Sequence, residues 1–246
     1  MKRIFDICFS LFGLILTLPI IVPVLIIVWL KDKSNPFYIS KRVGENGNLF
    51  KLIKIRTMVI NADISGVNST SLNDPRITSI GLIIRKYKID ELPQLINILK
   101  GEMSLVGPRP NVKRETDLYT KIESQLLKIK PGLTDFASIV FSDESEILAG
   151  SKDPDLTYNQ LIRPLKSRLG LFYIYQNNLL VDISLIFITL INSISRKKSL
   201  KMINRLLKNL NASQELIEAA SRKSKLIPSP PPGSDMITKS RNNNFK

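Results

Sequence analysis

The amino-acid sequence predicts a mostly helical α+β protein. An N-terminal helix-break-helix membrane segment precedes a small domain with one β-hairpin and interfacial amphipathic helices. Three observations support this fold class. Residues 7–30 carry no charged side chain, and residues 36–40 and 49–55 contain residues typical of strands on either side of an Asn-Gly pair. Most later apolar residues recur at the spacing of amphipathic helices.

The composition allows one domain with an appendage, because the chain has 246 residues and a hydrophobic content of 43%. The sequence contains no histidine. Histidine general bases, histidine triads and zinc sites with histidine ligands are therefore excluded. The one cysteine, Cys8, lies in the apolar segment, so no disulfide can form within the chain. Catalysis would depend on Asp, Glu, Lys, Arg, Tyr or hydroxyl side chains.

The uncharged segment from Ile7 to Leu30 has 24 residues, more than the ~20 that span a bilayer as a helix. A cleaved signal peptide would have a shorter apolar core that ends in small residues. This segment ends in Val28-Trp29-Leu30 instead. We therefore expect residues 1–33 to form a membrane segment that remains part of the protein.

The flanks and the middle of this segment bear on whether it crosses the membrane. Lys2 and Arg3 precede it and Lys31 follows it, so the positive-inside rule favours neither end. Pro19 and Pro23 lie near the middle, where each removes a helical hydrogen bond and bends the axis. We interpret the segment as a re-entrant hairpin broken at Pro19, and a crossing helix remains the alternative.

The most informative acids are Asp90 and Glu91, which precede apolar residues at helical spacing over 92–99. Asp90 is typical of a helix N-cap, and Gly101 supplies the expected end of the helix. Both carboxylates would then lie at the positive end of a helix dipole. For an isolated Asp-Glu pair, capping alone would be a sufficient explanation.

Nearby arginines favour a functional interpretation of the two acids. Arg85 lies upstream of them, and Arg109 follows in the stiff Gly-Pro-Arg-Pro sequence of residues 107–110. Lys54 and Arg56 end the predicted hairpin, where they are either solvated charges or phosphate contacts. Carboxylates that face arginines across a cleft indicate a site that handles phosphate.

The positive charge is concentrated at the C-terminal end. Residues 196–246 carry twelve Lys and Arg against three Asp and Glu, which accounts for +9 of the net charge of +15. Nucleic acid is one partner that such a segment could bind, but anionic membrane headgroups are the simpler explanation for a chain already attached to a bilayer. We expect residues 196–210 to form a basic helix, and residues 228–246 to form a disordered tail.

Four segments in order resemble a known family. They are Lys2–Asp6, the stretch from Arg42 to Met58, the run IDELPQLINILKGEMSLVGPRP that ends at Pro110, and Lys130–Thr134. Together they resemble the bacterial sugar transferases, the monotopic polyprenyl-phosphate phosphoglycosyl transferases. The resemblance covers residues 2–190.

This resemblance implies a function. A nucleotide diphosphosugar, usually a UDP-sugar, would give its sugar phosphate to polyprenyl phosphate and release UMP, the initiating step of capsule, O-antigen or exopolysaccharide assembly. Asp90 is similar to the family's covalent nucleophile, and an ionised carboxylate needs no base to attack phosphorus. We expect Mg²⁺ near Asp90 and Glu91, with Arg85 and Arg109 on the phosphate oxygens.

The resemblance also implies location. Residues 34–195 would form a catalytic domain on the cytoplasmic face of the bacterial inner membrane, in contact with membrane lipids. The family's re-entrant helix breaks at a Ser-Pro pair, whereas this chain has Leu18-Pro19. In the family's Pro-Gly-x-Thr-Gly turn, the final glycine is replaced here by Asp135. If this region contacts the nucleotide or sugar, its preference differs, so the sequence does not identify the sugar.

Two other classes of function remain open at this stage, and so does a homo-oligomer. A membrane-anchored protein that binds nucleic acid would explain the charge and the anchor but would leave the Asp-Glu pair unused. A scaffold without catalysis would fit if the acids only cap a helix.

Overall fold

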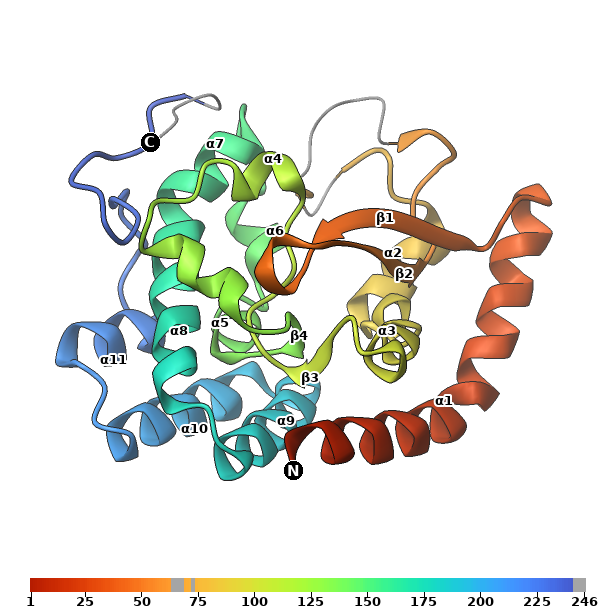
Figure 1. Cartoon of the computed structure of the whole chain (residues 1–246). Helices are drawn as coiled ribbons and strands as arrows, with labels where there is room; N and C mark the ends of the chain where they lie inside the picture. The colour runs from red at the N-terminus through yellow and green to blue at the C-terminus, as the bar shows by residue number, and fades with distance from the viewer. Residues whose placement is uncertain (63–68, 72–73, 241–246) are drawn as a thin grey trace.

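The computed structural model describes residues 1–62, 69–71 and 74–240. Helices surround two small sheets, and the N-terminal helix wraps around one edge of the body (Figure 1). The α-helices are α1 (Lys2–Asp32), α2 (Ser79–Lys86), α3 (Gln94–Lys100), α4 (Lys113–Thr116), α5 (Phe136–Val140), α6 (Glu144–Ile147), α7 (Pro154–Thr157), α8 (Arg163–Gln176), α9 (Leu179–Ile194), α10 (Arg196–Asn209) and α11 (Gln214–Ser221). Short 3-10 segments are η1 (Glu45–Gly47), η3 (Ile89–Glu91) and η4 (Glu123–Lys128), and η5 (Tyr158–Ile162) is a π-helical turn before α8.

The predicted hairpin is confirmed. Strands β1 (Phe37–Val43) and β2 (Leu49–Ile55) pair in antiparallel register. Asn46 has φ 56° and Gly47 has φ 80° in the turn between them, and both residue types tolerate this left-handed conformation. The Asn-Gly signal in the sequence therefore identified the turn correctly.

The second sheet was not predicted. Strands β3 (Ser104–Val106) and β4 (Gly132–Thr134) have three residues each and pair in parallel. Runs this short carry no measurable periodicity, and their pairing depends on residues far away in the sequence.

Helix α1 is a single bent helix from Lys2 to Asp32, where two helices separated by a break were expected. Pro19 and Pro23 lie inside it, and Figure 1 shows two arms that meet at a wide angle near the middle. Thr17 donates a side-chain hydrogen bond of 2.7 Å to the carbonyl of Gly13, a contact that often accompanies helix bending. In the described part of the chain, α1 is the one helix long and apolar enough to cross a membrane.

Both ends of α1 are attached to the same body. At the N-terminus, the ammonium group of Lys2 forms an ion pair with Asp182 of α9. At the C-terminus, Asp32 accepts hydrogen bonds of 2.5 and 2.7 Å from the guanidinium of Arg56, just after β2. Both ends of the bent helix therefore contact the same domain.

The expected cap of the central helix was wrong. Asp90 lies in η3, a turn ahead of α3, which begins at Gln94 after Pro93 and has no side-chain cap. Pro93 cannot donate a backbone hydrogen bond, so it is well suited to this position before the helix. Gly101, with φ 85°, ends α3 as predicted.

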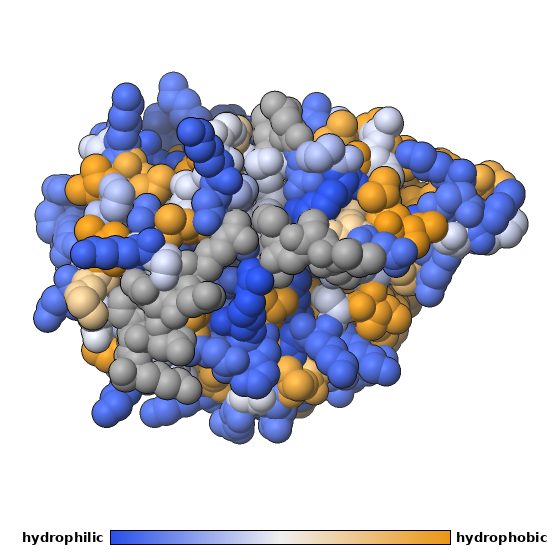
Figure 2. All heavy atoms as spheres, turned by 90° about the horizontal axis from the view of Figure 1, so that it is seen from above, coloured by the Kyte–Doolittle hydropathy of each residue, from blue (hydrophilic) through white to orange (hydrophobic). Residues whose placement is uncertain are grey.

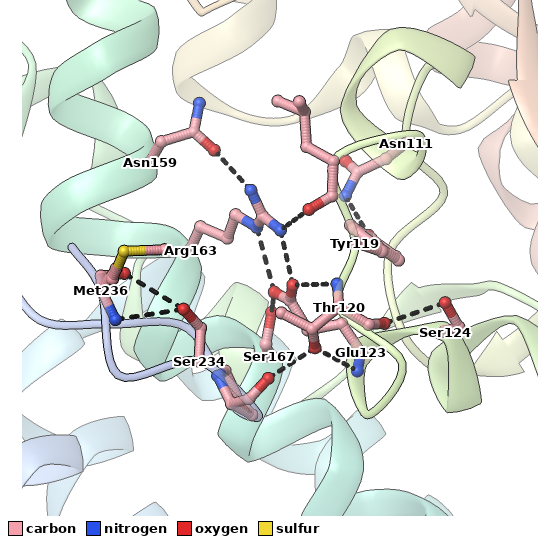
Figure 3. A network of polar contacts seen from close by, with 12 residues as sticks. Asn111, Tyr119, Thr120, Glu123, Ser124, Asn159, Arg163, Ser167, Ser234 and Met236 are labelled. Carbon is pink, nitrogen blue, oxygen red and sulfur yellow. Dashed lines mark hydrogen bonds and ion pairs between the residues drawn. The ribbon is translucent and has the colours of Figure 1, made fainter. Parts of the chain in front are cut away.

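A buried ion pair joins two helical segments at the centre of the body (Figure 3). Arg163 at the start of α8 is 3% exposed, and Glu123 of η4 is fully buried. Arg163 donates to both carboxylate oxygens, at 3.0 and 2.5 Å, and also to the side chain of Asn159 and the carbonyl of Leu118. Every oxygen of the buried acid thus has a donor, which offsets the cost of burying its charge.

The basic helix predicted at residues 196–210 is confirmed as α10. The segment after α11 has neither helix nor strand, yet it packs on the body, unlike the disordered tail that its composition predicts. Thr120 donates to the carbonyl of Pro232 at 2.5 Å, and Gln160 donates to the carbonyl of Thr238 at 2.8 Å. Residues 241–246 of the expected tail lie outside the described residues.

Glu123→Ala should lower the free energy of unfolding by about 3–5 kcal/mol, because it leaves the guanidinium of Arg163 buried without its acid. Chemical unfolding in detergent micelles measures this loss. The matched control is Asp117→Ala, which removes the exposed ion pair to Lys113 and should cost less than about 1 kcal/mol. Equal losses in the two variants would contradict the stabilising role of the buried pair.

Candidate functional site

The predicted acids and three of the predicted cations line one cavity of about 400 Å³. These residues are Lys54, Arg85, Asp90, Glu91 and Arg109. They come from β2, α2, the η3 turn and the loop after β3. The fold therefore gathers four distant segments around the two carboxylates.

Glu91 is the centre of this charge cluster. Its carboxylate accepts hydrogen bonds from Arg109, one of them from Nη1 at 3.2 Å and the other from Nη2. Lys54 Nζ donates to Glu91 at 3.0 Å and lies 3.8 Å from the nearer carboxylate oxygen of Asp90. Asp90 is 8% exposed and accepts no hydrogen bond from the described residues. Glu91 is therefore held by cations, whereas the Asp90 carboxylate is available.

The environment drives the pKa values of the two acids in opposite directions. Burial raises the pKa of Asp90, and the charge of Lys54 offsets this only in part. Burial would also raise the pKa of Glu91, but Arg109 and Lys54 hold it well below its usual range. Glu91 remains ionised at all ordinary pH values, and Asp90 is destabilised as an anion.

Two glycines position the Arg109 loop. Gly107 donates its backbone N–H to the Thr134 carbonyl at 3.0 Å, and Gly132 donates to the Pro108 carbonyl at 2.9 Å. A Cβ added at Gly132 would lie 2.0 Å from the Gly107 nitrogen, a distance that side chains cannot adopt. The Gly-Pro-Arg-Pro and Pro-Gly sequences therefore let two backbones approach closely, and this contact fixes the guanidinium beside Glu91.

The remaining predicted cations differ in their placement. Arg85 lines the cavity, and its guanidinium forms no hydrogen bond or ion pair with the residues that the structure describes. Arg56 does not line this cavity, and its guanidinium donates to Asp32 and to the carbonyl of Asn35. The geometry assigns Arg56 to the end of α1, whereas Arg85 is free to bind an anion.

Sequence reasoning missed the opposite wall of the cavity. Lys166 of α8 forms an ion pair with Glu144 of α6, and its ammonium lies 5.2 Å from the centroid of the Tyr158 ring. No local motif marks these residues, because they come from three segments that meet only in the fold.

The described residues hold no cluster of three or more Asp, Glu or Cys side chains that could bind a metal alone. Mg²⁺ is commonly bound by one or two carboxylates together with substrate phosphates. Asp90 and Glu91 supply two adjacent carboxylates, and the oxygens of Asp90 have no hydrogen-bond donor. The site therefore fits Mg²⁺ only in company with a phosphate ligand.

Comparison with known proteins places this geometry in a family. The sequence pattern of the family described as bacterial sugar transferase matches residues 1–196. The chain belongs to this family. The match includes every residue of the charge cluster and ends at the first residue of α10.

Three relatives illustrate the similarity. A putative undecaprenyl-phosphate N-acetylgalactosaminyl 1-phosphate transferase of Bacillus subtilis (strain 168) is 48% identical over 134 residues, 54% of this chain and 70% of that protein. The exopolysaccharide production protein ExoY of Sinorhizobium fredii is 39% identical over 148 residues, 54% of this chain and 66% of that protein. An undecaprenyl-phosphate glucose phosphotransferase of Komagataeibacter xylinus is 34% identical over 201 residues, 77% of this chain and 35% of that protein.

Asp90→Asn and Glu91→Gln in this sugar transferase should change stability in opposite directions. Because the fold raises the pKa of Asp90, its charge opposes folding at neutral pH, so a neutral side chain of the same shape should raise the unfolding midpoint. Because the fold lowers the pKa of Glu91, its ionised form stabilises the fold, and Glu91→Gln should cost about 2 kcal/mol.

Chemical unfolding at several pH values measures both effects. The difference in unfolding midpoint between wild type and Glu91→Gln should shrink as the pH falls below the ordinary pKa of glutamate. Below that pKa the unfolded chain takes up the proton, and the stabilisation by the ionised Glu91 carboxylate is progressively lost. A lower midpoint for Asp90→Asn at neutral pH would contradict the raised pKa of Asp90.

Proposed function

We propose that this chain transfers a sugar 1-phosphate from a nucleotide diphosphosugar to polyprenyl phosphate. The proposed donor is a UDP-sugar. The observation that carries the proposal is the Asp90 carboxylate, which is buried, free of hydrogen bonds among the described residues, and surrounded by cations in a cavity. The names of two relatives specify undecaprenyl phosphate as the lipid that they use.

In the first step, a carboxylate oxygen of Asp90 attacks the phosphorus that carries the sugar. The bond from that phosphorus to the bridging oxygen breaks, and UMP leaves with the electron pair. No general base is needed, because the nucleophile is already ionised, and this fits a chain without histidine. The product is a phosphosugar covalently bound to Asp90.

The cations of the site would offset the negative charge of the donor. Arg85 has its guanidinium free to bind a phosphate oxygen, and Arg109 is fixed by Glu91 with its planar donors toward the cavity. Mg²⁺ bound by Asp90, Glu91 and the donor phosphates would supply further charge neutralisation. The role of Glu91 is then to hold Arg109 and Lys54 in place as well as to contribute a metal ligand.

The attachment of both ends of α1 supports a re-entrant membrane segment. Lys2 binds Asp182 and Asp32 binds Arg56, so the two ends of an apolar helix lie on the same domain. A helix that crossed the bilayer would have to separate one of these pairs by the thickness of the membrane. The bend near Pro19 lets the segment enter and return, with the catalytic body on the cytoplasmic side of the inner membrane.

Transfer to polyprenyl phosphate would begin the assembly of a surface glycan. The printed name of the Sinorhizobium relative refers to exopolysaccharide production. A lipid acceptor that remains in the bilayer also explains why a polar cavity lies on a domain anchored by an apolar helix. The nucleotide sugar would arrive from the cytoplasm.

Asp90→Asn should lower transfer at least about a thousandfold, because asparagine keeps the shape but is a poor nucleophile. The assay follows label from UDP-glucose, UDP-galactose or UDP-N-acetylgalactosamine into undecaprenyl phosphate. Asp117→Asn is the matched control, since Asp117 is exposed and does not line the cavity.

EDTA should stop transfer and Mg²⁺ restore it, with no change in the unfolding midpoint. Near wild-type transfer by Asp90→Asn would overturn the proposed nucleophile.

The membrane topology gives a second test. A cysteine added directly before Lys2, on a Cys8→Ser background, should react with an impermeant thiol reagent only after spheroplasts are lysed. Tyr175→Cys, on the body, is the reference for a cytoplasmic position, since Tyr175 is 74% exposed. Pro19→Ala should straighten α1 and increase labelling from outside. External labelling of the unmodified helix would instead show that the segment crosses.

A further inference from the structure

A second cavity, of about 370 Å³, adjoins the first. The residues that line both are Arg42, Lys54, Thr70, Arg85, Asp90 and Val112. The Asp90 carboxylate can therefore be approached from two directions. A transferase that forms a covalent intermediate must bring two different substrates to one nucleophile. Two cavities that meet at the same carboxylate provide a place for each substrate.

The charges that line the two cavities differ. The first cavity combines its cations with several acids, which are Asp90, Glu91, Glu115, Asp135 and Glu144. The second is lined by Arg42, Lys54, Arg56, Arg76 and Arg85, and within the described part of the chain Asp90 is its one acid. Arg56 and Arg76 form ion pairs with Asp32 and Asp74. The guanidinium of Arg85 has no partner among the described residues, and Lys54 Nζ, which also donates to Glu91, lies 3.8 Å from Asp90. These two cations are therefore placed to bind an anion beside Asp90.

The other side of the second cavity is apolar. Met58, Val59 and Ile60 line it, and Val59 and Ile60 are 48% and 53% exposed. Ile55, also in its lining, packs against Val28 in the C-terminal arm of α1. Figure 2 shows apolar side chains close to the end of the molecule that carries this arm. An apolar path thus leads from the cations toward the membrane segment.

We propose that the second cavity binds the polyprenyl phosphate acceptor. Lys54 and Arg85 hold its phosphate, and the first isoprene units lie along Val59 and Ile60 toward the C-terminal arm of α1. The assignment rests on the proposed function. A phosphate joined to a hydrocarbon chain needs cations at one end of its site and apolar contacts at the other. The acid-rich first cavity suits the hydroxyl groups of the sugar and nucleoside.

The second chemical step follows from this placement. An oxygen of the acceptor phosphate attacks the phosphorus of the phosphosugar bound to Asp90. The bond between that phosphorus and the Asp90 oxygen breaks, and the carboxylate leaves with the electron pair. A diphosphate bond between lipid and sugar forms, and the Asp90 anion is restored. The step needs no oxidant, reductant or further reactant.

Val59→Glu tests the assignment, because it places an anion at the exposed apolar rim. The Michaelis constant for undecaprenyl phosphate should rise about tenfold or more through repulsion of the phosphate and lost apolar contact. The constant for the UDP-sugar should remain unchanged. Ile227→Glu is the matched control, since Ile227 is 75% exposed and lines neither cavity.

A half-reaction without acceptor separates this proposal from the proposed function. Wild type and Val59→Glu should both release a burst of UMP and gain the mass of one phosphosugar. An intact burst with an unchanged acceptor constant, or with a raised UDP-sugar constant, would overturn the acceptor site alone. The absence of a burst and of the mass increase in wild type would overturn the proposed function, and the acceptor site with it.

Discussion

The ion pairs of Glu91 are the interaction on which the site depends. They join three segments that are far apart in the sequence: the η3 turn, the end of β2 through Lys54, and the loop after β3 through Arg109. A half-buried carboxylate is costly without partners, and the two cations offset that cost. The same two cations then lie beside Asp90, whose charge they only partly compensate.

The placement of Arg109 depends in turn on backbone contact. Gly107 and Gly132 exchange close contacts between the ends of β3 and β4, and prolines on either side of Arg109 limit its backbone. The charge cluster and the short parallel sheet therefore support each other. Without the close approach, the guanidinium would not reach Glu91, and without Glu91 the half-buried guanidinium would lack its acid.

The membrane segment depends on a separate set of contacts. Asp6 accepts a hydrogen bond from the backbone N–H of Leu105 at 3.0 Å, so the first arm of α1 is tied to β3. Val28 in the second arm packs on Ile55 at the end of β2. Since β2 and the loop after β3 also supply Lys54 and Arg109, the same part of the fold positions both α1 and these two cations.

The sequence by itself determined the apolar segment with the prolines at its bend, the hairpin and the basic helix. It also determined the acids and three of the cations at the site. Each of these follows from neighbouring residues, because periodicity, turn chemistry and helix breaking act over a few positions. Only the tertiary structure decided that Asp90 lies in a turn and not at a helix cap, that Arg56 binds Asp32 and does not line the first cavity, and that Lys166 lines that cavity. These outcomes depend on contacts between distant segments, and a single sequence carries no local signal of which charges the packed chain brings together.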